Sequence, residues 1–288
     1  MGKSSIGNYL SLIKFSHTLF ALPFALVGYF LALEFSANEF ELSLFIKVVL
    51  CMVFARSAAM AFNRYVDRDI DKANQRTAEI REIPKGVIKA KSALIFVLLN
   101  AALFIGTTYF INSLCFYLSP IALLVVLGYS YTKRFTFLCH LILGIGLSLA
   151  PIGAYLAVTG SFAWLPIYYS FAVLFWVAGF DIIYALQDDA FDKKMGLNSI
   201  PVAIGRKWSL FVSVLFHLFT ALFMVHAALK ANADALYWTG TLVFIGLLIY
   251  QHFLVKINDL SRVNLAFFTT NGIASLIFSI FVILSFYL

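Results

Sequence analysis

Long apolar stretches alternate with short polar segments along the whole chain of 288 residues. A helix needs about 20 mainly apolar residues to cross a membrane, and nine stretches of the sequence reach or approach that length. Their approximate bounds are 15–33, 42–62, 93–111, 114–131, 135–158, 162–186, 208–229, 235–255 and 263–287. The pattern predicts an all-α, polytopic membrane protein, with nine transmembrane helices around a central cavity and a single domain over residues 1–288. Only Asn112 and Ser113 separate the third and fourth stretches, which predicts a tight helical hairpin.

The charged residues lie mainly between these stretches, and their distribution predicts the orientation of the chain. Hydrophobic residues make up 62% of the sequence and charged residues 12%, which excludes an ordinary soluble domain. If the nine stretches span the membrane, 18 of the 21 Lys and Arg residues fall on one side, and the positive-inside rule makes that side cytoplasmic. We expect the N-terminus inside, the C-terminus outside and a location in the bacterial inner membrane. The net charge of +7 follows from this orientation, so the expected partner is the lipid bilayer and not nucleic acid.

Asn63, Asp67 and Asp71 follow the second apolar stretch at intervals of four residues. On an α-helix this spacing places three oxygen-bearing side chains on one face. Such oxygens suit Mg²⁺, which proteins commonly hold together with substrate phosphates. The alternative is a solvated helix end, because Arg64 and Arg68 alternate with the acids and can form salt bridges with them.

A second group of acids, Asp181, Asp188 and Asp192, ends the sixth apolar stretch. Together with Tyr184 these residues fall on one helical face, whereas Asp189 points away and is the expected bystander. A helix end that faces water is the alternative here too.

The concentration of acids favours a functional interpretation of both groups. Nine of the 14 acidic residues lie in just two stretches, 67–82 and 181–192. Acids that abut a membrane span are costly, which makes them functional candidates by default. We therefore expect two acidic clusters on the cytoplasmic face, positioned to hold a metal-bridged diphosphate between them.

Basic residues near the clusters can hold the remaining phosphate oxygens. The candidates are Arg76, Arg81, Lys133, Arg134 and Lys193. For any one of them, a role in orientation or in lipid-headgroup contact is the simpler explanation. Arg56 differs, because it lies inside the second apolar stretch, where a charge faces the bundle interior. It can neutralise Asp181 or bind an acidic substrate.

The histidines and the common catalytic motifs add little. His17 and His140 lie near the cytoplasmic ends of spans, and a hydrogen-bonded core or interface histidine is favoured there over a substrate contact. The sequence holds no HExxH, GxSxG, P-loop or dinucleotide fingerprint.

These motifs resemble the signatures of the UbiA superfamily of intramembrane prenyltransferases. The matching segments are Asn63-x-x-x-Asp67-x-x-x-Asp71 with Arg76-Thr77 and Arg81-Glu-Ile-Pro84-Lys-Gly86, then Tyr129-Ser-Tyr-Thr-Lys133, then Asp181-x-x-Tyr184-Ala-x-x-Asp188-x-x-x-Asp192. The likeness covers nearly the whole chain. It departs at Arg64, where many members carry a second Asp, a position that need not face the metals.

Within the superfamily the chain is most similar to the 4-hydroxybenzoate polyprenyltransferase branch. Residues 14–23, which include His17, and residues 131–140 carry this closer likeness. Some members of the subgroup are thought to serve the futalosine route to menaquinone with a different aromatic acid. The resemblance does not separate the two.

The resemblance implies transfer of a polyprenyl group from a polyprenyl diphosphate to an aromatic acid acceptor, in ubiquinone or menaquinone biosynthesis, with Mg²⁺ as the cofactor. The implied metal ligands are Asn63, Asp67, Asp71, Asp188 and Asp192. The implied diphosphate ligands are Arg76, Arg81, Lys133 and Lys193. The aromatic substrate is assigned to Arg56 and Tyr129. Catalysis is assigned to Asp181 as the base or acceptor-orienting group, Lys133 and Tyr184.

An allylic cation would need aromatic faces around it. The candidates are Phe62, Tyr65, Phe180 and Tyr184.

Other classes of protein remain alternatives. An ion-coupled membrane transporter would use the carboxylates for cations or protons, but it would place charges near the membrane midplane, and here the acids gather at one face. A CDP-alcohol phosphotransferase would carry an Asp-Gly-x-x-Ala-Arg pattern, which the sequence does not contain. A prenyltransferase with a non-quinone acceptor, such as a haem or chlorophyll, is the third alternative.

Overall fold

A computed structural model describes residues 5–14 and 21–288, and most of the described chain is helical. The elements in chain order are α1 (Ser5–Leu12), α2 (Leu22–Glu34), α3 (Leu42–Val66), α4 (Arg68–Ala73), α5 (Gln75–Ala78), α6 (Ala90–Tyr109), α7 (Ser113–Thr132), α8 (Cys139–Thr159), α9 (Trp164–Ala185), α10 (Asp189–Lys194), α11 (Ile200–Lys230), α12 (Ala235–Leu254), the π-helical turn η2 (Leu265–Thr270) and α13 (Asn271–Ser285).

Eight of the nine predicted spans coincide with described segments that are long and apolar enough to cross a membrane. The first predicted span, 15–33, coincides over its described part with the shorter apolar helix α2. Residues 15–20, His17 among them, lie outside the described residues. The all-α polytopic fold is thus confirmed. Helices α6 and α7 form the expected hairpin, in which the Cys115 N–H donates to Asn112 Oδ1 at 2.8 Å.

Two predicted spans differ from the structure in local detail. The apolar pattern starts the seventh span at 208, but α11 begins at Ile200, where the Ser199 hydroxyl caps the Val202 N–H. Gly205 then bends the helix with a φ of 75°, a conformation that glycine adopts readily. The last predicted span, 263–287, matches a described segment that consists of a π-helical turn followed by α13. Hydrophobicity alone does not report such a widened turn.

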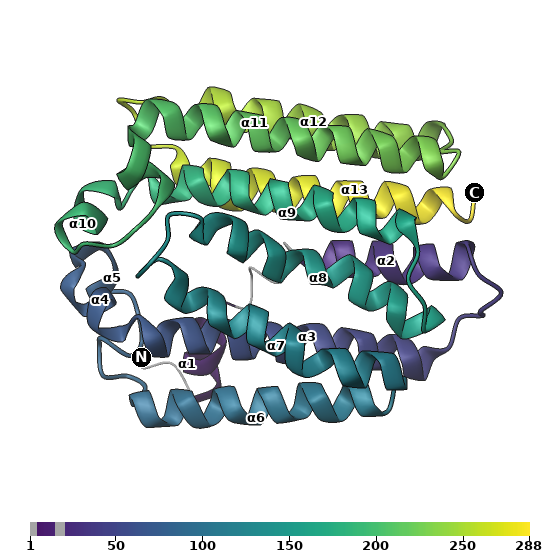
Figure 1. Ribbon diagram of the computed structural model, residues 1–288, viewed down its shortest axis with the longest axis horizontal. Coiled ribbons are helices and arrows are strands. Elements are labelled where there is room, and N and C mark those ends of the chain that lie inside the picture. The colour runs from purple at the N-terminus through teal and green to yellow at the C-terminus, as the bar shows by residue number, and fades with distance from the viewer. Residues whose placement is uncertain (1–4, 15–20) are drawn as a thin grey trace.

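The long helices run side by side, as Figure 1 shows, and α9 packs between α8 and α11. Helix α3 packs against α6 and α7, and α12 packs against α13. The short helices α4, α5 and α10 gather at one end of the bundle, and the C-terminus lies at the opposite end. The segments that follow α3 and α9, which carry the two acidic clusters, therefore share one end of the bundle.

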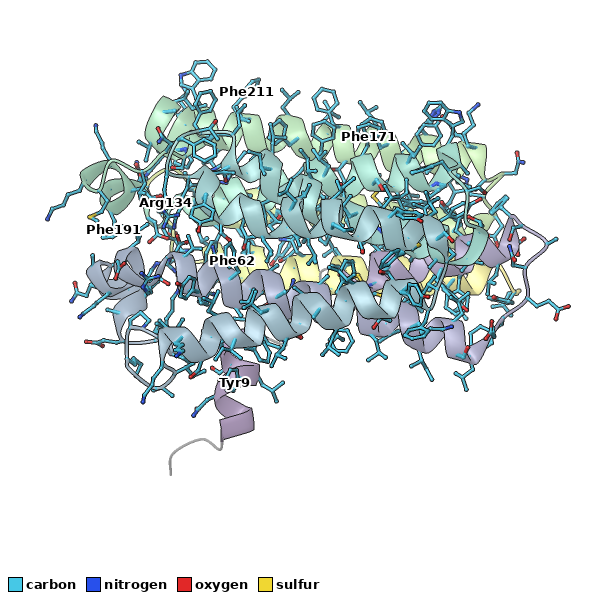
Figure 2. All side chains as sticks on the ribbon, turned by 60° about the horizontal axis from the view of Figure 1, so that its bottom comes forward. Tyr9, Phe62, Arg134, Phe171, Phe191 and Phe211 are labelled. Atoms are coloured by element: carbon cyan, nitrogen blue, oxygen red, sulfur yellow. The ribbon has the colours of Figure 1, made fainter. Side chains whose placement is uncertain are left out.

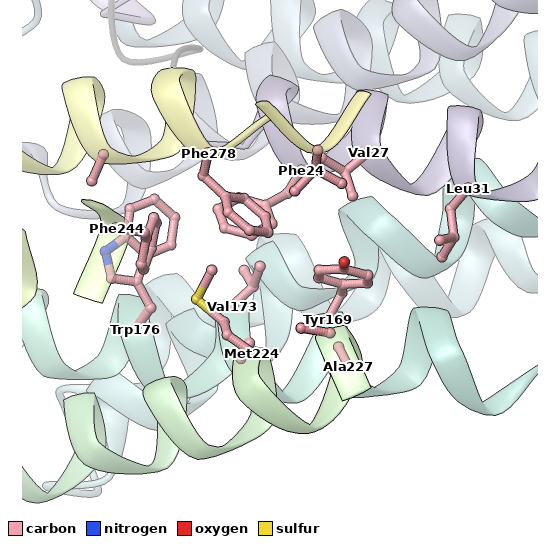
Figure 3. Close-up of a cluster of buried hydrophobic side chains, with 14 of the residues drawn as sticks. Phe24, Val27, Leu31, Tyr169, Val173, Trp176, Met224, Ala227, Phe244 and Phe278 are labelled. Carbon is pink, nitrogen blue, oxygen red and sulfur yellow. The ribbon is translucent and has the colours of Figure 1, made fainter. Parts of the chain in front are cut away.

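Large apolar side chains cover the outside of the bundle, as expected for a protein surrounded by lipid. Phe171 and Phe211, labelled in Figure 2, are both exposed. The largest internal cluster joins α2, α8, α9, α11, α12 and α13, and Figure 3 shows Phe24 and Trp176 within it. Their ring centroids lie 5.2 Å apart. This cluster fixes the position of α9, which carries Asp181.

Two glycines let helices approach at the level of the backbone. A Cβ at Gly28 would collide with the Pro151 carbonyl group of α8, and a Cβ at Gly144 would collide with the Leu174 carbonyl group of α9. Small residues at such crossings are typical of membrane helix packing. Helix α8 is thus held between α2 and α9, which sets the position of His140 in its first turn.

Candidate active site

One cavity of about 700 Å³ runs from the acidic clusters into the bundle. Residues of α3, α6, α7, α8, α9 and η2 line it. Away from the acidic clusters the lining is mainly apolar, and it extends to Ile111 and Phe162 in the α6–α7 and α8–α9 connections. The polar end is lined by Asn63, Arg64, Asp67, Arg81, Lys133, Asp181, Asp188 and Asp192. Residues of both clusters thus face a single cavity, and its apolar part can accommodate a long hydrocarbon chain.

The first acidic cluster is not a row on one continuous helix, which is a correction to the sequence pattern. Helix α3 ends at Val66 and α4 begins at Arg68, with Asp67 at the junction. Backbone hydrogen bonds between residues four apart nevertheless continue across the junction. The Asp67 N–H donates to the Asn63 carbonyl oxygen at 2.9 Å, and the Asp71 N–H donates to the Asp67 carbonyl oxygen at 2.7 Å.

The second cluster repeats this local structure. Helix α9 ends at Ala185 and α10 begins at Asp189, so the predicted helical face through 181–192 is made by two helices. The Asp192 N–H donates to the Asp188 carbonyl oxygen at 2.7 Å. Each cluster therefore presents two aspartates four residues apart, the first of them immediately before a six-residue helix.

Arg76 joins the two clusters directly. It lies in α5, beyond the first cluster, and its guanidinium binds the Asp188 carboxylate of the second. Asn74 Nδ2 also donates to Asp188 Oδ1, at 3.0 Å. Arg76 Nη1 donates to the Tyr184 hydroxyl at 3.1 Å. Sequence reasoning missed Asn74, whose only signal is its position between Asp71 and Arg76.

Basic side chains pair with the first cluster as well. Arg81 binds Asp71. Lys133 Nζ lies 2.8 Å from Asp67 Oδ2, and Arg134 Nη2 lies 3.1 Å from Asp67 Oδ1. Arg134 thus belongs to the site, whereas the sequence favoured an orientation charge.

Asp192 forms no ion pair with any of the described residues. Burial raises the pKa of its carboxyl to about 6, and the charge of Lys133 partly offsets that rise. Burial disfavours the ionised carboxylate, and a nearby cation restores it. In the first cluster, Asp71 Oδ2 is buried without a hydrogen-bond partner. Each pair of aspartates therefore keeps an oxygen for a further cation.

These oxygens fit a magnesium ion that phosphate helps to hold. Among the described residues, no group of three or more Asp, Glu, His or Cys side chains could hold a metal ion by itself. Proteins usually bind Mg²⁺ through one or two carboxylates together with water and substrate phosphates. Each pair of aspartates supplies that number.

Arg64 lies in the site. The sequence did not require this position to face the metals. Its side chain lines the cavity, and Nη1 donates to Asn63 Oδ1 at 3.1 Å. The Asn63 amide nitrogen in turn donates to Asp67 Oδ2 at 3.1 Å. Asn63 therefore orients Asp67, and any metal at Asn63 Oδ1 shares that atom with Arg64.

Asp181 pairs with His140 and not with Arg56. His140 Nδ1 lies 2.7 Å from Asp181 Oδ2, and the Ile200 N–H donates to His140 Nε2 at 3.4 Å. Because Nε2 accepts, Nδ1 carries the proton and donates to the carboxylate. The hydrogen-bonded histidine predicted at 140 is thus confirmed.

Arg56 and Tyr129 line the cavity on facing helices, α3 and α7. Arg56 Nε is buried without a hydrogen-bond partner among the described residues. A buried guanidinium is costly unless an anion compensates it. This part of the cavity is therefore suited to a carboxylate ligand.

Two predictions concern α10. Lys193 is exposed and does not line the cavity, so the structure does not bring it to the other diphosphate candidates. Asp189 also lies off the cavity lining, as predicted, but it is not a bystander. Its carboxylate accepts from Arg206 Nε at 2.6 Å and from Arg206 Nη2 at 2.9 Å. This bidentate pair ties α10 to α11.

The aromatic candidates divide into two groups. Phe180 and Tyr184 line the cavity, whereas Phe62 and Tyr65 do not.

Sequence reasoning missed Phe267 and Phe268, which line the cavity from η2. The Phe267 ring centroid lies 4.2 Å from that of Tyr184. The only sequence signal near them is a polar pair, Thr270 and Asn271, inside an apolar stretch.

The fold and the site together define a class, a polytopic membrane enzyme in which aspartate pairs and basic side chains meet at one end of an apolar cavity. The chain belongs to the UbiA prenyltransferase family, whose profile matches residues 21–273. It is therefore a prenyltransferase.

Comparison with individual proteins agrees with this membership. The chain is 33% identical over 235 residues to a 4-hydroxybenzoate octaprenyltransferase of Aliivibrio fischeri strain MJ11, a match that covers 80% of this chain and 79% of that protein. The apo structure of a UbiA homologue from Aeropyrum pernix K1 is 31% identical with a TM-score of 0.84, covering 93% of this chain and 97% of that one. A UbiA homologue from Archaeoglobus fulgidus, bound to GPP and Mg²⁺, shares the fold with a TM-score of 0.73 at 22% identity, covering 98% and 100%.

Proposed function

We propose that this chain transfers a polyprenyl group from a polyprenyl diphosphate to an aromatic acid of the 4-hydroxybenzoate type, in quinone biosynthesis. The observation that carries the proposal is one cavity lined by aspartates of both clusters at its polar end and by Arg56, whose Nε is buried without a hydrogen-bond partner, further in. The relative from Aliivibrio fischeri is named for this reaction, which supports the acceptor and the long prenyl donor.

Asn63, Asp67 and Asp71 would hold Mg²⁺ at the first cluster, and Asp188 and Asp192 would hold Mg²⁺ at the second. Bound there, Mg²⁺ withdraws charge from the leaving diphosphate. The oxygens that remain available on Asp71 and Asp192 support this assignment. The homologue from Archaeoglobus fulgidus that is bound to GPP and Mg²⁺ shares only the fold with this chain, at 22% identity. The assignment of metal ligands therefore rests on the residues of this chain.

Arg76, Arg81 and Lys133 bind the diphosphate oxygens. Each of these side chains already contacts an aspartate of one of the two clusters, so a change of side-chain torsion brings it to a phosphate. Charge-assisted hydrogen bonds from such groups are among the strongest that proteins form. Lys193 stays only a predicted diphosphate contact, since its exposed side chain does not line the cavity in this structure.

The reaction begins when the bond between prenyl C1 and the diphosphate oxygen breaks. The electron pair goes to the diphosphate, and an allylic cation remains. Phe180 and Tyr184 face the cavity, and each aromatic face stabilises the cation by about 0.5–2 kcal/mol. A ring carbon of the acceptor then bonds to C1, and Asp181 accepts the displaced ring proton. His140 holds the Asp181 carboxylate in place through its Nδ1–H.

Arg56 and Tyr129 bind the acceptor, with the guanidinium paired to the acceptor carboxylate. The futalosine-route alternative differs only in the aromatic acid, so parallel assays with 4-hydroxybenzoate and a hydroxynaphthoate separate the two. A macrocyclic acceptor assayed in parallel tests the non-quinone alternative.

Residues 1–288 act as one domain in this proposal, because the cavity takes its lining from α3 through η2. The active site faces the cytoplasm, with the N-terminus in and the C-terminus out. The positive-inside distribution of basic residues, and the gathering of α4, α5 and α10 at the end opposite the C-terminus, support that orientation.

The test uses the purified protein with geranyl diphosphate, 4-hydroxybenzoate and Mg²⁺. Prenylated acid should form with the wild type, cease in EDTA and fall about 100-fold or more in Asp67→Ala, because the leaving group then lacks its counter-charge. Asp69→Ala is the matched control, because the Asp69 side chain is 84% exposed, and it should stay active. Prenylation that survives both Asp67→Ala and EDTA would refute the proposal. Ion-coupled uptake by proteoliposomes, without prenylation, would favour the transporter.

A further inference from the structure

A closed circuit of hydrogen bonds lies inside the bundle, away from the acidic clusters. Trp176 Nε1 donates to Asn271 Oδ1 at 2.7 Å, and Asn271 Nδ2 donates to Gln251 Oε1 at 3.2 Å. Gln251 Nε2 then donates to His217 Nδ1 at 3.4 Å, and His217 Nε2 donates to the Trp176 carbonyl oxygen at 3.3 Å. These four residues, the polar circuit, come from α9, α13, α12 and α11, and all are buried. Figure 3 shows Trp176 among the surrounding apolar side chains.

The chemistry of the side chains fixes the direction of every bond. The Trp176 indole can only donate, so the Asn271 oxygen faces it and the Asn271 nitrogen faces Gln251. His217 donates from Nε2 to a carbonyl group, so its Nδ1 is the acceptor. His252 Nε2 adds a second donor to that atom at 2.8 Å. Each nitrogen and oxygen of these four side chains has a partner, and a buried polar network of this kind favours one arrangement of the helices around it.

Asn271 connects the polar circuit to the π-helical turn η2. Its Nδ2 also lies 3.0 Å from both the Ala266 and the Phe267 carbonyl oxygens. The Thr270 hydroxyl donates to the Leu265 carbonyl oxygen at 3.2 Å. A π-helical turn departs from the usual backbone ladder, and a carbonyl left unpaired within a membrane costs several kcal/mol. Asn271 and Thr270 therefore stabilise a turn that the apolar residues around them would not.

The turn presents two consecutive rings to the cavity. Phe267 and Phe268 line it together with Phe180 and Tyr184, and these four residues form an aromatic wall. The Phe267 centroid lies 4.2 Å from Tyr184, 5.1 Å from Phe180 and 4.6 Å from Phe268.

The aromatic wall begins at the diphosphate end of the cavity. The Tyr184 hydroxyl accepts a hydrogen bond from Arg76, which binds Asp188. Prenyl C1 is bonded to the diphosphate, so it lies beside this wall when the diphosphate is bound there.

We propose that Asn271 is a positioning residue, which acts through the polar circuit and η2 to hold Phe267 and Phe268 against the carbon where the cation forms. The inference rests on the proposed function. In place, the rings stabilise the cation and exclude water. When they are displaced, a water oxygen bonds to C1 and releases its proton, so the product is a prenyl alcohol instead of a prenylated acid.

The experiment compares the full-length wild type with Asn271→Leu, Phe267→Leu and the control Ser279→Ala. Ser279 lies on the same helix as Asn271. Among the described residues, its buried hydroxyl bonds only within that helix, to the Leu276 carbonyl oxygen. The readout is the ratio of prenyl alcohol to prenylated acid formed from geranyl diphosphate and 4-hydroxybenzoate. We expect this ratio to rise about threefold or more in Asn271→Leu and Phe267→Leu, and to stay unchanged in Ser279→Ala. A smaller folded fraction would lower both products in proportion and leave the ratio constant.

Hydrogen exchange supplies a readout that needs no turnover. Backbone amides of residues 265–271 should exchange faster in Asn271→Leu than in the wild type or in Ser279→Ala. An unchanged product ratio in Phe267→Leu would overturn the wall, and unchanged exchange in Asn271→Leu would overturn the positioning role. A wild type that forms no prenylated acid would refute the proposed function, while the exchange measurement still decides whether Asn271 holds the turn.

Discussion

Arg76 and Asp188 lie 112 residues apart in the sequence, and their ion pair joins the two acidic clusters. The pair places the Arg76 guanidinium, which follows the first cluster in the sequence, on a carboxylate of the second cluster. Arg81 and Lys133 likewise neutralise Asp71 and Asp67. The same basic side chains are the candidates for the diphosphate, so binding of metal and binding of diphosphate must be coupled.

The first prediction concerns this coupling. Mg²⁺ alone has to compete with the internal cations, whereas pyrophosphate draws those cations away from the carboxylates and adds oxygen ligands of its own. We expect the apparent affinity for Mg²⁺ to rise about 10-fold or more when pyrophosphate is present, and the reverse effect must be equal by linkage. Thermal unfolding of the detergent-solubilised protein, titrated with MgCl₂ at two pyrophosphate concentrations, measures it. Equal affinities would contradict the coupling.

The second prediction concerns Arg56. Removal of the cation in Arg56→Gln should raise the KM for 4-hydroxybenzoate by about 10-fold or more, since a buried charge pair with the carboxylate is lost. The KM for geranyl diphosphate should stay unchanged, because Arg56 lies about two helical turns before Asn63 on α3, away from the polar end of the cavity. Arg68→Gln is the control, because Arg68 bonds to the Tyr65 carbonyl group and does not line the cavity. A rise confined to the donor KM would move Arg56 to the diphosphate site.

Much of the fold follows from the apolar stretches, because a membrane span of about 20 apolar residues is a strong signal. The four aspartates could also be expected in one site, since acids are costly beside a membrane span. The helix breaks at Asp67 and Asp188 could not be predicted from the sequence. Local hydrogen bonds decide whether a helix continues, and a periodic residue pattern carries no information on those bonds.

Pairing between distant segments is the other part that the sequence leaves open. Asn74, Arg134 and Asp189 each resemble ordinary loop residues, and only the packing of α5, α7 and α10 gives them their partners. The widened turn at Phe267 is invisible for a related reason. An apolar stretch is equally compatible with an α-helix. The bonds from Asn271 to the turn are local, but the orientation of its side chain depends on tertiary contacts with Trp176 and Gln251.

The third prediction concerns the ion pair between Asp189 and Arg206, which fixes α10 and therefore Asp188 and Asp192. Asp189→Arg and Arg206→Asp should each lower kcat several-fold, and the double exchange should restore most of it, because the bidentate pair can form in reverse. The free energy of unfolding should change by less than about 1 kcal/mol, since the pair is partly exposed. Exchange of Arg68 and Asp69, a surface pair 3.7 Å apart, is the control. Single and double variants with the same kcat would show that the pair does not position α10.

The fourth prediction tests the room made for the polar circuit. A Cβ at Gly179 would collide with the His217 imidazole, so Gly179→Ala must displace His217 from the Trp176 carbonyl group and from Gln251. Overpacking of this kind costs about 1–3 kcal/mol, and the displaced circuit should loosen Asn271. We expect a lower thermal midpoint together with a larger share of prenyl alcohol among the products. Gly246→Ala is the matched control, because a Cβ there meets nothing within 4 Å, and alanine favours the helix. If Gly179→Ala lowered the midpoint while the product ratio stayed at the wild-type value, His217 would stabilise the bundle without acting on the aromatic wall.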